Sequence, residues 1–179
     1  LGIEFYWGDG STGAGAMQSS LAYAQLGHGG YDADNASNAN GDPGNNGDIT
    51  VNAGADIIFK AGGGQRTSAQ LGHGGNITKG AHSGNISVTT TGGKVQFTSG
   101  IGGADGDYES YSQLGHGGYD GDGNHFGDIT VISTEDGSGL GVVFKAGDRR
   151  DNYTQMGHGG SSARSGTDAN PFGLNGDIT

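Results

Sequence analysis

Histidine is the residue type whose spacing most suggests chemistry in this chain. The hexapeptide Gln-Leu-Gly-His-Gly-Gly starts at residues 25, 70 and 113, and it returns at 155 with methionine in place of leucine. These starts lie 45, 43 and 42 residues apart, so each copy marks one unit of a repeat. The units supply two columns of polar side chains: His28, His73, His116 and His158; Gln25, Gln70, Gln113 and Gln155.

A column of imidazoles could bind a transition metal, because stacked copies would place corresponding residues about 4.8 Å apart. A metal site, however, usually gathers several different ligands at one point, whereas a column spreads one kind of ligand along a line. We therefore expect each histidine to close a corner of the chain by bonding to backbone. We also expect neutral imidazoles in such a column, so that acidification loosens the stack.

Acidic loops are the second group with chemical potential. The segments Asp-Gly-Asp-Gly-Asn and Asp-Ala-Asp-Asn alternate oxygen ligands in the way that calcium sites do, and they supply these candidates: Asp120, Asp122, Asn124, Asp32 and Asp34. The glutamate that closes an EF-hand loop is missing, since Val131 occupies the twelfth position. Solvated turns are the favoured interpretation and an ordered calcium ion in one loop is the alternative. We expect no other cofactor.

Recurring aspartates do not indicate catalysis. Asp48, Asp128 and Asp177 occupy one position of the repeat, and Asn85 replaces the carboxylate in the second copy. A catalytic pair needs two differently tuned carboxylates at one place, not the same residue in every unit. We therefore expect turn residues here, and a protein that is not an enzyme.

The composition excludes several classes of protein. With 42 glycines, 2 prolines and 31% hydrophobic residues, the chain can build only a thin core, or else is disordered. The net charge is −11 and the 8 basic residues are scattered, which argues against a nucleic-acid partner. There is no cysteine, and no apolar stretch approaches the roughly 18 residues of a membrane span.

Three strand-like pieces per unit must position these residues. The first contains a phenylalanine (1–8, 55–62, 93–100, 140–147), the second leads into the hexapeptide (23–26, 68–71, 111–114, 153–156), and the third alternates apolar and polar residues (47–51, 84–88, 127–131, 176–179). In the second piece the small residue and the leucine share a face, with tyrosine and glutamine on the other. The variable segments 31–46, 76–83, 119–126 and 161–175 are typical of surface loops.

Short strands in a constant order, without helices between them, predict an all-β parallel β-helix solenoid of about four turns with three strands each. The chain is then one repetitive segment, 1–179, with turns at approximately 1–50, 55–88, 93–131 and 140–179. Its core contains an internal aromatic ladder: Phe5, Phe59, Phe97 and Phe144. Glutamine amides are expected to bond to their own copies in the next turn.

The order of motifs gives the chain a family resemblance. Tyr-Ala-Gln-Leu-Gly-His-Gly-Gly is followed by a Gly/Asn/Asp loop, Gly-Asp-Ile-Thr-Val and a strand ending in Phe-Lys-Ala-Gly. Nearly all of the chain in this way resembles the repeats of large bacterial surface proteins of the filamentous-haemagglutinin-like, two-partner-secretion type. The resemblance implies a secreted, right-handed β-helix that forms a fibre at the cell surface and acts in adhesion, biofilm or surface coating. The N-terminal secretion domain of such proteins is absent from this sequence.

The repeat also predicts partners. Residues 1 and 179 both fall inside a unit, so we expect an excerpt of a longer array or one unit of a polymer. Neither end contains a cap, and uncapped strand edges pair with other strands. We therefore expect copies of the chain, or further repeats, to stack on both ends of an extracellular fibre or adhesin segment that attaches to surfaces, including cell-surface glycans. The alternative is a calcium- or glycan-binding module on the same scaffold.

Overall fold

The computed structural model describes residues 1–6, 21–33, 44–100, 109–134, 137, 139, 141–148, 150–163 and 174–179. Within these residues the chain is all-β, without helix, and its strands are parallel and arranged in stacked sheets. The all-β, parallel part of the expected fold class is confirmed. Residues 7, 8 and 140 of the predicted phenylalanine pieces, and the calcium candidate Asp34, lie outside the described residues.

The phenylalanine pieces form one parallel sheet in the order β1-β5-β9-β13, with the bounds Ile3–Tyr6, Ile57–Lys60, Val95–Thr98 and Val142–Lys145. The register places each phenylalanine beside its copy in the next unit. Ring centroids along the ladder are 4.6, 4.9 and 5.2 Å apart, and the planes are within 9° of parallel. One strand spacing separates the rings because the strands are in register.

The pieces that lead into the hexapeptide form the sheet β14-β10-β6-β2: Tyr153–Met156, Tyr111–Leu114, Ser68–Leu71 and Tyr23–Leu26. The third pieces form the sheet β12-β8-β4: Ile129–Ser133, Ile86–Thr90 and Ile49–Ala53. Two smaller pairs complete the described strands: β3 (Gly29–Tyr31) with β7 (Gly74–Asn76), and β11 (His125–Phe126) with β15 (Leu174–Asn175).

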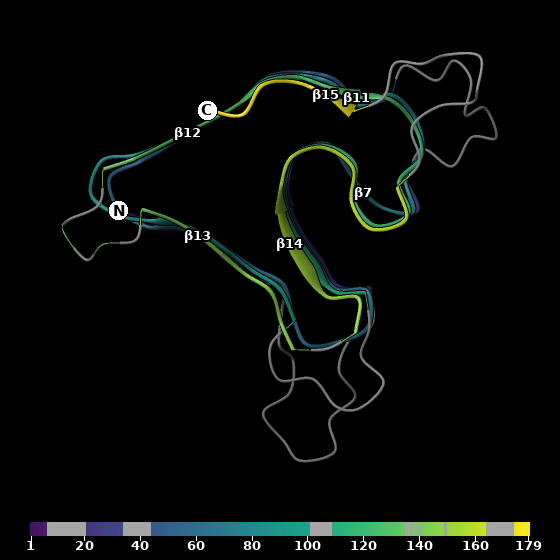
Figure 1. The fold of residues 1–179 in the computed structure, drawn as a ribbon, viewed down its shortest axis with the longest axis horizontal. Coiled ribbons are helices and arrows are strands. Elements are labelled where there is room, and N and C mark those ends of the chain that lie inside the picture. Colours follow the sequence, from purple (N-terminus) through teal and green to yellow (C-terminus); the bar gives the residue numbers. More distant parts are fainter. Residues whose placement is uncertain are drawn as a thin grey trace.

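The three larger sheets surround one thin apolar core (Figure 1). Strict alternation in β8 buries Ile86 and Val88, while Phe59 and Phe97 enter from the first sheet and Leu71 from the second. Each strand therefore contributes only one or two apolar side chains. Stacking the units in register joins these few residues into a continuous core, which is why a chain with so little apolar material can fold.

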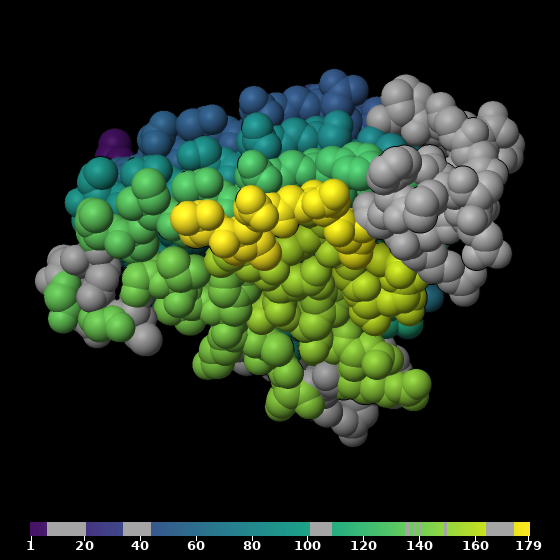
Figure 2. Space-filling view, turned by 45° about the horizontal axis from the view of Figure 1, so that its top comes forward, coloured from purple at the N-terminus to yellow at the C-terminus, as the bar shows by residue number. Residues whose placement is uncertain are grey.

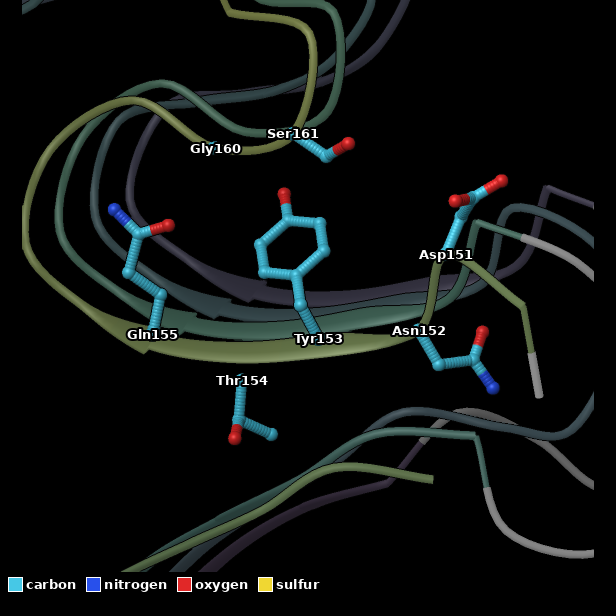
Figure 3. Close-up of a pocket in the computed structure, with 7 residues that line it drawn as sticks. All are labelled: Asp151, Asn152, Tyr153, Thr154, Gln155, Gly160 and Ser161. Atoms are coloured by element: carbon cyan, nitrogen blue, oxygen red, sulfur yellow. The ribbon is translucent and has the colours of Figure 1, made fainter. Parts of the chain in front are cut away.

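The chain doubles back after the second sheet. Residues 27–33, 72–78, 115–121 and 157–163, here called the curl, pass over the outer face of the strands that precede them (Figure 1). As a result Gln70 and Tyr111 are no more than 1% exposed, although tyrosine and glutamine lie on the face opposite the apolar core. The predicted alternation of direction is present, with Thr154 opposed to Tyr153 and Gln155 (Figure 3), but both faces of the inner strands are buried.

The interpretation of the two short variable segments as surface loops is wrong. Residues 76–83 and 119–126 have the same length, so they stack in register through the bridges Lys79–Asp122 and Ser83–Phe126. Thr78 is fully buried as a consequence. The two longer segments, 31–46 and 161–175, lie mostly outside the described residues.

Successive units form layers in the space-filling view, and the last unit forms one end of the stack (Figure 2). Among the described strands, β13 and β14 at that end each pair on one side only, and at the other end the same holds for β1 and β2.

Candidate functional site: a histidine and glutamine spine with an open end

The four hexapeptide histidines form a stacked column. Neighbouring imidazole centroids are 5.2, 5.0 and 4.9 Å apart, with planes within 5° of parallel. His73 and His116 are buried, His158 is half-buried, and His28 is exposed at the end formed by the first unit. The column lies where the chain leaves the second sheet and enters the curl.

Backbone hydrogen bonds fix the tautomer of the inner histidines. The backbone N–H of each histidine donates to Nδ1 of the next one: His28 to His73 (3.1 Å), His73 to His116 (3.0 Å) and His116 to His158 (3.1 Å). Since Nδ1 accepts, the proton is on Nε2, which donates to a glycine carbonyl at 2.7–2.9 Å: Gly47, Gly84 or Gly127. Both ring nitrogens are used, so none is available to a metal without losing a bond.

Burial keeps these imidazoles neutral. It lowers the pKa of His73 and of His158, and it lowers the pKa of His116 to about 3. A protonated ring would also carry a hydrogen on Nδ1, which would then face the backbone N–H that donates to Nδ1 in the neutral form. The neutral form is therefore the only one that fits the spine.

The glutamines bond to backbone and not to one another, which corrects the expected glutamine ladder. The Nε2 atom of Gln70 donates to the carbonyls of Gly115 (3.0 Å) and Gly117 (2.9 Å) in the next unit and to His73 in its own (3.3 Å). Gln25 and Gln113 repeat this pattern. The bend of the Gly-His-Gly segment turns two carbonyls of the next unit toward each amide, which donates to them.

Glycine is required beside each histidine because the next unit occupies the place of a side chain. A Cβ atom on Gly72 would lie 2.0 Å from the carbonyl oxygen of Gly115, and one on Gly115 would lie 2.0 Å from that of Gly157. Both residues also have φ near +145°. The carbonyls that approach so closely are those that the glutamines bind.

The recurring aspartates are exposed turn residues that link successive units. The backbone N–H of Asn85 donates to Asp48 Oδ1 (2.7 Å), that of Asp128 to Asn85 Oδ1 (2.9 Å), and that of Asp177 to Asp128 Oδ1 (2.9 Å). Asparagine can replace aspartate here because both offer the Oδ1 atom. The column thus has a structural explanation that does not involve proton transfer.

The four calcium candidates that the structure describes do not form one cluster. Asp32 and Asp120 occupy the same column, but Ile77 lies between them, as the bonds of the curl backbone show. Asp122 Oδ1 and Asn124 Oδ1 are buried without a hydrogen-bond partner among the described residues. Within the same residues there is no group of three or more His, Cys, Asp or Glu side chains able to hold a metal ion.

A second histidine pair was missed by the sequence analysis. His82 and His125 are fully buried and their rings stack with centroids 5.2 Å apart. The backbone N–H of Asn45 donates to His82 Nδ1, whereas neither ring nitrogen of His125 has a partner in the described part of the chain. Burial lowers the pKa of His125 to about 3. The signal was available, because the two residues are 43 positions apart, as are Gln70 and Gln113.

An ionic cluster spans the entrance to the curl in the inner units. Arg66 Nε lies 2.6 Å from Glu109 Oε2, and the Tyr119 hydroxyl donates to Glu109 Oε1 at 2.7 Å. Burial opposes ionisation of Glu109, but the bonds from Arg66 and Tyr119 outweigh it and lower the pKa of this carboxyl. Donation to Glu109 raises the pKa of Tyr119 to about 12.

In the last unit Arg150 Nε lies 3.2 Å from Asp151 Oδ2, and a pocket of about 380 Å³ lies between β14 and the curl. Tyr153 points across it toward Gly160 and Ser161, with Asp151 at the rim (Figure 3). One face of the Tyr153 ring stacks on Tyr111, with centroids 5.3 Å apart. The pocket lies on the side of β14 that has no partner strand.

The described residues include no helix long and apolar enough to cross a membrane. Comparison with known proteins places the chain beside no relative: no family model, no curated protein and no solved structure matches it.

Proposed function

We propose that the chain is a structural segment of an extracellular fibre or adhesin. Its architecture would be a right-handed parallel β-helix solenoid of about four turns, each with three short strands. In-register parallel pairing of successive units in three separate sheets supports this architecture. The scattered basic residues and the backbone-bonded histidines favour a structural role over a catalytic one.

The observation that carries the proposal is that both ends of the stack present the same side-chain columns, on strands that have a partner on one side only among the described strands. β1 and β2 offer Phe5 and Gln25 at one end, and β13 and β14 offer Phe144 and Gln155 at the other. Unpaired edges of this kind bind further strands unless they are blocked. Copies of the chain, or further repeats, would therefore stack end to end into a filament. Attachment to surfaces and glycans, and matrix formation, would depend on the variable segments.

Electron microscopy of the native protein tests this function. We expect long fibres with a continuous strand ladder and a rise near 4.8 Å per turn in the image reconstruction. Discrete particles with capped ends, observed at every protein concentration tested, would contradict the proposal.

Calcium binding is a second candidate function, favoured by the unpartnered oxygens of Asp122 and Asn124. Isothermal titration with CaCl₂ should then show one site, which Asp122→Ala removes. Asp32→Ala is the matched control, because Asp32 is an acidic residue of the curl in another unit. No heat of binding with millimolar calcium would eliminate this candidate.

A further inference from the structure

We infer that the open end beside β14 is a socket for the first unit of a second copy of this chain, bound in the register that joins β10 to β14. This inference rests on the proposed end-to-end stacking and specifies its polarity, its register and the atoms that meet. The partner strands from the second copy are β1, β2 and β4.

The end formed by the last unit has donors that lack their usual acceptors. In the three preceding units each glutamine donates to two glycine carbonyls of the following unit, whereas the only acceptor of Gln155 among the described residues is His158 O, at 3.0 Å. The N–H groups of His28, His73 and His116 each donate to the next imidazole. The described residues contain no imidazole beyond His158 to accept its N–H.

The end formed by the first unit has the matching acceptors. Gly72 O, Gly74 O and His73 Nδ1 accept the bonds of the unit before them. The corresponding atoms of the first unit are Gly27 O, Gly29 O and His28 Nδ1, and the described residues contain no unit before the first. A second copy placed in register would thus place two acceptors opposite the Gln155 amide and one opposite the backbone N–H of His158.

Two further bonds run in the opposite direction and fix the polarity. His73 Nε2 donates back to Gly47 in the preceding unit, so His28 of the second copy would donate to the carbonyl of Gly176. The backbone N–H of Asn85 donates back to Asp48 Oδ1, so the backbone N–H of Asp48 in the second copy would donate to Asp177 Oδ1. Contacts between two first units, or two last units, would place like groups opposite each other. Only a head-to-tail joint pairs every donor with an acceptor.

Aromatic side chains would fill the remaining space at the joint. Tyr153 lines the pocket beside β14, and Tyr23, at the same position of the first unit, is 52% exposed. Phe144 and Phe5 are likewise the ends of one ladder. A sugar could occupy the pocket but would leave the phenylalanine, histidine and aspartate columns open. A second copy satisfies the sites in all three sheets at once.

Disulfide trapping of the 179-residue chain tests the joint, because the chain has no cysteine of its own. Tyr6 and Lys145 are exposed residues at the same position of the first sheet, three strand spacings apart within one copy. At about 4.8 Å per spacing they are too distant for an internal disulfide, but a head-to-tail joint would make them direct neighbours across copies. The double variant Tyr6→Cys/Lys145→Cys should therefore form a ladder of linked oligomers on oxidation.

The matched control is Glu4→Cys/Lys145→Cys, which is two residues out of register and should remain monomeric on a non-reducing gel. A ladder in both variants, or in neither, would overturn the joint. Fibres seen by electron microscopy without a register-specific ladder would refute this joint while leaving end-to-end stacking intact; absence of both fibres and ladder would refute both. As a second measurement, Gln155→Leu should weaken self-association by about 10- to 100-fold, since buried carbonyls lose their donor. Unchanged self-association would contradict the inference.

Discussion

Lowering the pH from 8 to 5 should destabilise the folded chain, because its buried histidines resist protonation. Burial lowers the pKa of His116 and of His125 to about 3, whereas a histidine in an unfolded chain has a pKa of about 6.5. Below that value the unfolded chain binds more protons than the folded chain, so acid favours unfolding. This stability is fully present above about pH 6.5 and is lost as the pH falls toward 3.

The expected loss is large relative to the stability of a protein of this size. A histidine whose pKa falls from 6.5 to about 3 on folding costs about 2 kcal/mol of unfolding free energy by pH 5, so two such residues cost about 4 kcal/mol. His73 and His158 shift in the same direction and add to this loss. A change of about 4 kcal/mol corresponds to a decrease in Tm of about 8–16 °C.

Guanidinium unfolding followed by circular dichroism at pH 8, 7, 6 and 5 measures the effect. The control variant is His116→Asn, whose side-chain oxygen can accept the His73 N–H bond but does not titrate. We expect it to be less stable than the native chain at pH 8, yet to lose about 2 kcal/mol less between pH 8 and pH 5. Equal stability of the native chain at both pH values, or an unaltered pH dependence in the variant, would refute the reasoning.

Three further predictions concern single side chains. His125→Leu should leave the fold intact and raise the free energy of unfolding by about 1–2 kcal/mol at pH 8. Leu174 occupies the same column, and the His125 imidazole has no hydrogen-bond partner among the described residues. A less stable variant would show that the ring does have a hydrogen-bond partner. Gln70→Leu should cost about 1–3 kcal/mol in denaturant unfolding, because it removes the amide donor to Gly115 O, while Gly117 O keeps its bond from the Gly75 N–H; Gln155→Leu should change the stability of the monomer by less than about 0.5 kcal/mol. Phe97→Ala should cost about 3–5 kcal/mol of unfolding free energy, since its fully buried ring stacks on two others. Glu109→Gln, which weakens the ion pair with Arg66, should cost about 1 kcal/mol. A smaller cost for Phe97→Ala than for Glu109→Gln would contradict the phenylalanine ladder as the core.

Repetition in the sequence was enough to predict the parallel pairing. When an aliphatic residue precedes a phenylalanine by two in every unit, stacking the units in register is the arrangement that buries all of these side chains together. The register Ile57–Val95 and Phe59–Phe97 follows directly from that pattern. The same reasoning could have found the pair His82 and His125, because equal spacing in a repeat indicates stacking whether or not a motif surrounds the residues.

The curl could not be predicted from the pattern of apolar residues. Alternation in Tyr111–Leu114 shows that two faces differ, but it does not show whether the polar face is covered. Coverage depends on a reversal of the backbone at Gly115 and Gly117, which glycine permits at many φ values without specifying one. The direction of the reversal is set by the bonds from Gln70 to those two carbonyls, which join different units.

These contacts explain why the hexapeptide is nearly constant while other segments vary. Its glutamine binds the glycine carbonyls of the next copy, its histidine N–H binds the next imidazole, and its first glycine makes room for the next carbonyl. A change in one copy therefore breaks a bond made by another copy, and only a matching change there could restore it. The leucine contributes packing alone, which Met156 can replace. Constancy of this motif follows from self-recognition between units, and it requires no bound ligand or catalytic step.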